Sequence, residues 1–124
     1  MIMVIGGAHQ GKLAYARRLW PDIAWAGGRT CGEEEIFRCG GIYGFHEYIA
    51  GRMRDGADLS VLPGKLWAEN PGIVIVTDEI GCGIVPAERH LREYRELTGR
   101  ICTELAAVSA EVHRVLCGIG TRIK

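Results

Sequence analysis

A glycine-rich loop near the start of the chain constrains the fold more than any other feature of the sequence. It reads G-G-A-H-Q-G-K over residues 6–12, follows an apolar run at residues 1–5 and precedes a predicted helix over residues 12–20. Strand, glycine turn and helix in this order are the context that a phosphate-binding loop requires. Backbone N–H groups then point inward around an anion, and the lysine reaches its terminal phosphates. The alternative is a glycine-rich turn that only joins a strand to a helix.

The predicted binding residues are those of the loop and the one that follows it: Gly6, Gly7, Ala8, His9, Gln10, Gly11, Lys12 and Leu13. Leu13 departs from the motif, which asks for serine or threonine at this position. The missing hydroxyl is the group that normally holds Mg²⁺ beside the phosphates, and leucine has no atom that can ligate a metal. The sequence therefore predicts phosphate binding, whereas Mg²⁺ binding is doubtful and no metal site is assigned.

Length and charge limit the class of protein. The 124 residues suit one domain with a buried core, so residues 1–124 are treated as a single nucleotide-binding domain. Lys plus Arg and Asp plus Glu balance at 15 each, and no basic field indicates nucleic acid or a membrane surface. We find no secretory signal and no apolar stretch near the ~20 residues of a membrane span, and we expect a cytoplasmic protein. The five scattered cysteines indicate buried thiols rather than zinc ligands or disulfides.

Short strands alternate with helices along the chain, which predicts a mostly parallel sheet with helices on both faces. The continuous β-branched run at residues 73–77 should be a central strand buried on both faces. Pro86 suits the first turn of the longest helix. Further strands are predicted over residues 22–26, 36–39, 112–117 and 121–124, and helices over residues 42–53, 59–69 and 86–108.

Two carboxylates, Asp78 and Glu79, follow the predicted central strand. Ligands of open α/β sheets bind beyond the carboxyl ends of the strands, so both side chains should face the loop across a crevice. With Lys12 they are the candidate catalytic residues, and any surviving metal contact would come from one of them. The alternative is that Asp78 or Glu79 caps the turn through Gly81 and Gly83.

Several segments resemble one known family. They are T-D-E-I-G-C-G-I-V-P at residues 77–86, T-G-R at residues 98–100, G-I-G-T-R-I-K at residues 118–124, and the loop itself. Together they resemble the bifunctional adenosylcobinamide kinase and adenosylcobinamide-phosphate guanylyltransferase family of cobalamin biosynthesis, over residues 1–20 and 72–124. The resemblance implies a P-loop NTPase-like three-layer α/β fold and phosphate transfer from ATP or GTP to a corrinoid alcohol. It also implies GMP transfer through a guanylylated histidine, and a homo-oligomer, commonly a trimer.

The chain departs from this family at two further places. The family usually carries an acidic residue before a cysteine on its third strand, whereas this chain has Arg38 before Cys39, and a guanidinium would repel Mg²⁺. The segment between the second and third strands is shortened, and no histidine occurs at residues 22–39, where the family nucleophile lies. His46 is a candidate substitute nucleophile, but its placement does not match the family nucleophile, and a surface histidine on an amphipathic helix is the commoner explanation.

We therefore expect a nucleotide-binding protein with doubtful kinase activity and no guanylyltransferase activity. Without metal charge stabilisation, a loss of ~4 kcal/mol would slow phosphoryl transfer about 10³-fold. The alternative is a non-catalytic paralogue that binds phosphate, nucleotide or a corrinoid, or assembles with a full-length enzyme.

Overall fold

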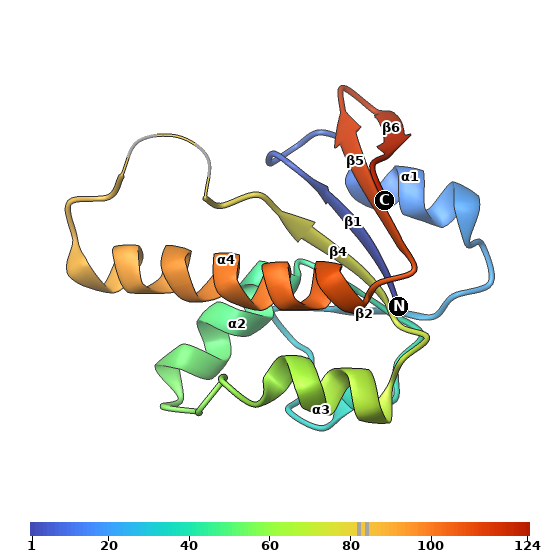
Figure 1. The fold of residues 1–124 in the computed structure, drawn as a ribbon. Helices are drawn as coiled ribbons and strands as arrows, with labels where there is room; N and C mark the ends of the chain where they lie inside the picture. Colours follow the sequence, from blue (N-terminus) through green and yellow to red (C-terminus); the bar gives the residue numbers. More distant parts are fainter. Residues whose placement is uncertain (82, 84) are drawn as a thin grey trace.

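The computed structural model describes residues 1–81, 83 and 85–124, which form a six-stranded sheet flanked by helices (Figure 1). The strands are β1 (Ile2–Gly6), β2 (Trp25–Gly27), β3 (Gly41–Tyr43), β4 (Val74–Asp78), β5 (Glu111–Leu116) and β6 (Ile119–Arg122). The helices are α1 (Lys12–Leu19), the 3-10 helix η1 (Glu35–Phe37), α2 (Phe45–Arg54), α3 (Leu62–Glu69) and α4 (Arg89–Val108). The sheet order is β2-β3-β4-β1-β5-β6, and only the β5–β6 pair is antiparallel.

The sheet separates two hydrophobic clusters, because successive side chains of a strand point to opposite faces. On β4, Val74 and Val76 pack in the cluster that contains Ala16 of α1. Ile75 packs on the other face, in the larger cluster that also contains residues of α2, α3 and α4. Figure 1 shows these three helices together and α1 apart from them. The predicted α/β architecture with helices on both faces of a mostly parallel sheet is confirmed.

Strand β4 lies inside the sheet, as the β-branched run predicts. It pairs in parallel with β3 on one side and β1 on the other, and Val74, Ile75 and Val76 are buried. In the β1–β4 register Gly6 is the partner of Asp78. The start of the glycine-rich loop and the acidic end of the central strand therefore meet at the same edge of the sheet.

The predicted third strand at residues 36–39 is wrong. Residues there form η1, whose turn closes through hydrogen bonds from Arg38 and Cys39 N–H to the carbonyl of Glu35. The strand is β3, which begins at Gly41, where an added Cβ would lie 2.6 Å from the Trp25 ring. A β-branched residue cannot fit at this position, so the usual sequence signal of a strand is missing. The predicted helix over residues 42–53 consequently begins later, at Phe45.

The last helix also begins later than predicted. It starts at Arg89, and Pro86 lies outside it, with its carbonyl accepting a hydrogen bond from Arg92 at 3.2 Å. Ile101 and Leu105 are buried, whereas Leu91 is 41% exposed, because the first turns of α4 extend past the other elements in Figure 1. The end of the chain forms a hairpin of β5 and β6, with its turn one residue earlier than predicted, at residues 117–118.

Cysteine burial is mixed, and the expectation of mostly buried thiols holds only in part. Cys31 is buried, Cys39 and Cys102 are partly buried, and Cys117 is exposed; Cys82 lies outside the described residues. Over the described part of the chain, the helices are too short or too polar to cross a membrane.

Candidate phosphate-binding site

A cavity of about 510 Å³ opens at the carboxyl ends of β1, β3 and β4. This volume lies within the range of ~300–1,000 Å³ that is typical of small-molecule sites. One wall consists of residues 8–14, from the loop and the first turn of α1. The other wall consists of Arg29, Tyr43, Gly44, His46 and Glu47, and Asp78 reaches the cavity from the end of β4.

The phosphate loop, residues 6–12, has the backbone that its glycines predict. Gly11 has φ +85° and caps α1 without a side-chain hydrogen bond, so the first N–H groups of α1 have no side-chain cap. Gly6 has φ +157°, and an added Cβ would lie only 2.4 Å from the Val115 carbonyl oxygen. His9 adopts φ +60°, which is uncommon outside glycine. Uncapped N–H groups at the start of a helix favour an anion.

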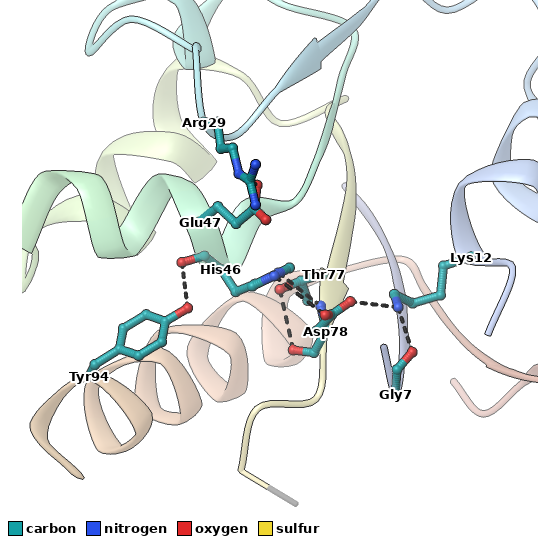
Figure 2. A network of polar contacts seen from close by, with 8 residues as sticks. All are labelled: Gly7, Lys12, Arg29, His46, Glu47, Thr77, Asp78 and Tyr94. Atoms are coloured by element: carbon teal, nitrogen blue, oxygen red, sulfur yellow. Dashed lines mark hydrogen bonds and ion pairs between the residues drawn. The ribbon is translucent and has the colours of Figure 1, made fainter. Parts of the chain in front are cut away.

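Lys12 lies at the bottom of the cavity, and its side chain is only 7% exposed. Its ammonium donates a hydrogen bond to the Gly7 carbonyl at 2.7 Å and forms an ion pair with Asp78 Oδ1 at 2.6 Å (Figure 2). An ammonium has three N–H donors, so one remains for a phosphate oxygen. The loop thus surrounds a cation that is already paired with the Asp78 carboxylate.

His46 faces the same carboxylate from α2 (Figure 2). Its Nδ1 accepts a hydrogen bond from the Asp78 N–H at 3.2 Å, and its Nε2 lies 3.4 Å from Asp78 Oδ2. Burial lowers the pKa of His46 below its usual value, and this effect outweighs the opposing charges of Asp78 and Glu47. Because Nδ1 accepts a hydrogen bond, the neutral ring carries its proton on Nε2, the nitrogen that faces Asp78 Oδ2. His46 lines the cavity, and its interpretation as a surface histidine is wrong.

Tyr94 of α4 fixes the position of His46 from behind. Its hydroxyl donates a hydrogen bond to the His46 carbonyl at 2.8 Å. Burial raises the pKa of Tyr94 to about 12, so the hydroxyl stays protonated as a donor. The long C-terminal helix thus supports one wall of the cavity from outside it.

Glu79 does not share the position of Asp78. Its carboxylate lies 3.4 Å from Arg114 Nη2 of β5, and it is not among the residues that line the cavity. Its N–H donates to the Gly6 carbonyl at 2.9 Å, which ties the start of the loop to the end of β4. Consecutive residues of an extended chain point in opposite directions, which separates the two carboxylates.

The side chains present do not fit a Mg²⁺ ion. Position 13 supplies no oxygen, and the Asp78 carboxylate is already engaged by Lys12 and His46. In the described part of the chain, no group of three or more His, Cys, Asp and Glu side chains is placed to hold a metal. The side-chain oxygens beside Lys12 are those of Asp78, and they already face Lys12 and His46 rather than an open metal position.

Arg38 has no place in this site. It precedes the amino end of β3, so it lies at the opposite edge of the sheet from the cavity. It is exposed and lines a surface hollow with Glu34, Phe37 and Glu69. The argument that its guanidinium repels a metal from the phosphates is wrong, because it rested on the wrong third strand.

Apart from His46, sequence reasoning missed the opposite wall of the cavity. Arg29 and Glu47 form an ion pair of 3.3 Å at its edge, and Tyr43 ends β3 beside them. The sequence did contain a signal for this wall. Tyr43 ends a strand, Gly44 forms the turn, and His46 lies at the start of the following helix. That is the same order as in the phosphate loop, and it places polar side chains at the carboxyl end of a parallel strand.

Comparison with known proteins points to one family. The model of the family described as cobinamide kinase / cobinamide phosphate guanyltransferase matches residues 57–123. Two curated proteins named bifunctional adenosylcobalamin biosynthesis protein CobU, from Escherichia coli (strain K12) and Salmonella typhimurium (strain LT2), are each 48% identical to the chain over 52 residues. The aligned stretch is 42% of this chain and only 29% of each relative. The family match includes Asp78 and the β5–β6 hairpin, and it does not reach Lys12 or His46.

Proposed function

Since this chain belongs to the cobinamide kinase / cobinamide phosphate guanyltransferase family, we propose that it binds the phosphate groups of ATP or GTP in the cavity around Lys12. The observation that carries the proposal is the placement of Lys12. Its ammonium lies at the bottom of a cavity of about 510 Å³, inside a loop whose glycines and helix start favour an anion. The third N–H of Lys12 and the loop amides would hold the terminal phosphates.

Phosphoryl transfer in this site is slow or lost. A phosphate charge placed 4 Å from Asp78 would be repelled by about 4 kcal/mol at an effective dielectric of ~20. In the motif a metal bound through serine or threonine separates such charges, and Leu13 cannot hold one. The histidines among the described lining residues are His9 of the loop and His46 of α2, and neither lies at residues 22–39, where the family resemblance places the nucleophile. The protein therefore acts as a nucleotide-binding member of the family without guanylyltransferase activity.

A weak kinase that phosphorylates a corrinoid or related alcohol is the second candidate. The observation that favours it is the position of Asp78, 2.6 Å from Lys12 and 3.4 Å from His46. A carboxylate beside a phosphate-binding lysine could accept the proton of an acceptor hydroxyl. In this candidate Lys12 and Asp78 are catalytic, and Glu79 positions the loop through its N–H bond to Gly6.

A thermal-shift titration with ATP or GTP, with and without Mg²⁺, tests the binding proposal. Ligand at 100 times its Kd should stabilise the fold by about 2.7 kcal/mol. Lys12→Ala should remove that stabilisation, whereas Lys65→Ala, at a half-exposed lysine paired with Glu69, should keep it. Equal binding by wild type and Lys12→Ala would reject the site.

Nucleotide consumption in the presence of cobinamide separates the two candidates. Stabilisation without turnover supports the binding protein. Metal-dependent turnover that is lost in Lys12→Ala supports the kinase. Absence of turnover under all metal conditions, with binding intact, rejects the kinase.

The exposed apolar residues of the β5–β6 hairpin and of the residue that follows it support self-association as a further part of this proposal. Leu116, Ile119 and Ile123 are 66%, 72% and 57% exposed. A homo-oligomer, such as a trimer, or a complex with a full-length enzyme would cover them. Sedimentation velocity of the purified chain tests this, and a monomer at micromolar concentration would contradict self-association.

A further inference from the structure

We infer that Gln10 is a positioning residue that fastens the phosphate loop to the turn between β5 and β6. It holds the loop in its anion-binding shape without being the group that neutralises the anion. The inference rests on the proposed function in one respect, because the ligand of the loop is the triphosphate proposed above. The fastening itself is a property of the chain and can be measured without any ligand.

Two hydrogen bonds join Gln10 to the turn, across more than a hundred residues of sequence. Its side-chain Oε1 accepts from the Cys117 N–H at 2.7 Å. Its backbone carbonyl accepts from the Gly118 N–H at 2.8 Å. Both donors belong to the two residues of the hairpin turn. The side chain of Gln10 is therefore bonded to the first turn residue and its backbone carbonyl to the second.

Close backbone packing supports this attachment at both ends of the loop. A Cβ added at Gly6 would lie 2.4 Å from the Val115 oxygen, and one added at Gly11 would lie 3.3 Å from the Gly118 Cα. The hairpin thus lies against the start of the loop, against its end and, through Gln10, against its middle. No other strand connection reaches all these points in the contacts described for the loop.

The hairpin is itself anchored to α1, which follows the loop. The Tyr15 hydroxyl is hydrogen-bonded to His113 Nδ1 at 2.8 Å. The Tyr15 ring also covers Gly120 so closely that a Cβ there would lie 2.1 Å from it. The hairpin therefore contacts both α1, through Tyr15, and the loop that precedes α1. Gln10 is the side chain that makes the contact from the loop.

The loop needs such a fastening because His9 adopts a backbone conformation that is uncommon outside glycine. Gln10 lies between His9, with φ +60°, and Gly11, with φ +85°. Residues in sparsely populated backbone regions persist only where their surroundings over-determine them. If the loop were free to leave this shape, a bound phosphate would have to order it, and affinity would fall by the cost of ordering.

Gln10→Met tests the inference, because methionine keeps the length of the side chain and removes its amide oxygen. We expect affinity for ATP and for inorganic tripolyphosphate, measured by calorimetry well below Tm, to fall about tenfold. Hydrogen exchange should accelerate at the amides of residues 8–12 and of Cys117, and stay unchanged in β4. A purely structural role would lower Tm while leaving affinity at low temperature unchanged.

Two matched variants sharpen the test. Gln10→Glu keeps an oxygen acceptor for the Cys117 N–H, so slow exchange of that amide should be restored, although the added charge weakens anion binding. Val61→Thr changes a 61% exposed side chain at the residue before α3 and should alter neither affinity nor exchange of the loop.

The outcomes separate this inference from the proposed function. If wild type binds neither ATP, GTP nor tripolyphosphate, the proposed function fails, and faster loop exchange in Gln10→Met still supports the fastening. If wild type binds and Gln10→Met binds equally well, the inference fails alone. Unchanged loop exchange in Gln10→Met overturns it whether or not a ligand binds.

Discussion

The floor of the cavity (Lys12, His46 and Asp78) and its rim (Arg29, Tyr43 and Glu47) contain the same kind of interaction in different surroundings. On the floor, Lys12 and Asp78 lie 2.6 Å apart with side chains 7% and 26% exposed. On the rim, Arg29 and Glu47 lie 3.3 Å apart with side chains 82% and 35% exposed. Exposed pairs contribute ~0–1 kcal/mol because water and salt screen them, whereas breaking a buried pair leaves an uncompensated charge.

This difference in exposure indicates which side chains of the site are held in one position by their surroundings. The floor residues come from the start of α1, the start of α2 and the end of β4, and backbone contacts hold each of them. The rim arginine comes from the loop after β2, is itself 82% exposed and pairs with the partly exposed Glu47 carboxylate. We therefore expect changes at the floor, where the proposed phosphate site lies, to have large effects and changes at the rim to have small ones.

Gly6→Ala should have the largest effect on stability, because it disturbs the packing of the loop that carries Lys12 against β5. The added methyl group would lie 2.4 Å from the Val115 oxygen, and the backbone of β5 cannot move away cheaply. We expect the free energy of unfolding to fall by about 3 kcal/mol in urea denaturation. Gly7→Ala is the control, since its nearest contact is the flexible Gln10 side chain at 3.7 Å. Equal losses in the two variants would contradict the role given to Gly6.

Asp78→Asn should strengthen nucleotide binding on the floor. The amide oxygen can still accept from Lys12, but the negative charge that opposes a phosphate is removed. We expect affinity for ATP in calorimetry to rise about tenfold, corresponding to ~1.4 kcal/mol. Asp55→Asn, which changes an exposed carboxylate paired with Arg52, should leave affinity unchanged. Weaker binding by Asp78→Asn would show instead that the carboxylate assists the ligand.

Acidification should weaken the floor through His46. Its pKa in the fold is lowered from 6.5, so the unfolded chain binds more protons in the window below pH 6.5, and the free energy of unfolding falls as pH decreases there. One such group contributes at most ~1.4 kcal/mol per pH unit. His46→Gln should flatten this slope, while His90→Gln, at a histidine 75% exposed, should preserve it. Identical pH profiles for all three proteins would contradict the buried neutral histidine.

Arg29→Gln should have the smallest effect, because it acts at the rim. We expect the free energy of unfolding to change by less than about 0.5 kcal/mol. Stability curves in low and in high salt provide the measurement, and the small difference should vanish in high salt. A loss above ~1 kcal/mol would mean that the rim is as fixed as the floor.

Sequence patterns located the elements whose signals are local. The phosphate loop, the buried β4 run and the long α4 each carry their signal within one window of residues, so their existence and order could be predicted. The family resemblance of residues 72–124 was equally local, and it lies mostly within the matched range 57–123. Element ends were less certain, as the start of α4 at Arg89 rather than near Pro86 shows.

The sequence by itself determined that a glycine loop follows a strand, that it carries Lys12, and that position 13 has no hydroxyl. Only the tertiary structure decided that β3 starts at a glycine packed against Trp25, that His46 reaches Asp78, and that Gln10 is held by the hairpin turn. Each of these contacts joins segments far apart in the chain. Their geometry depends on strand order and register, and no pattern within a single window of residues encodes either one.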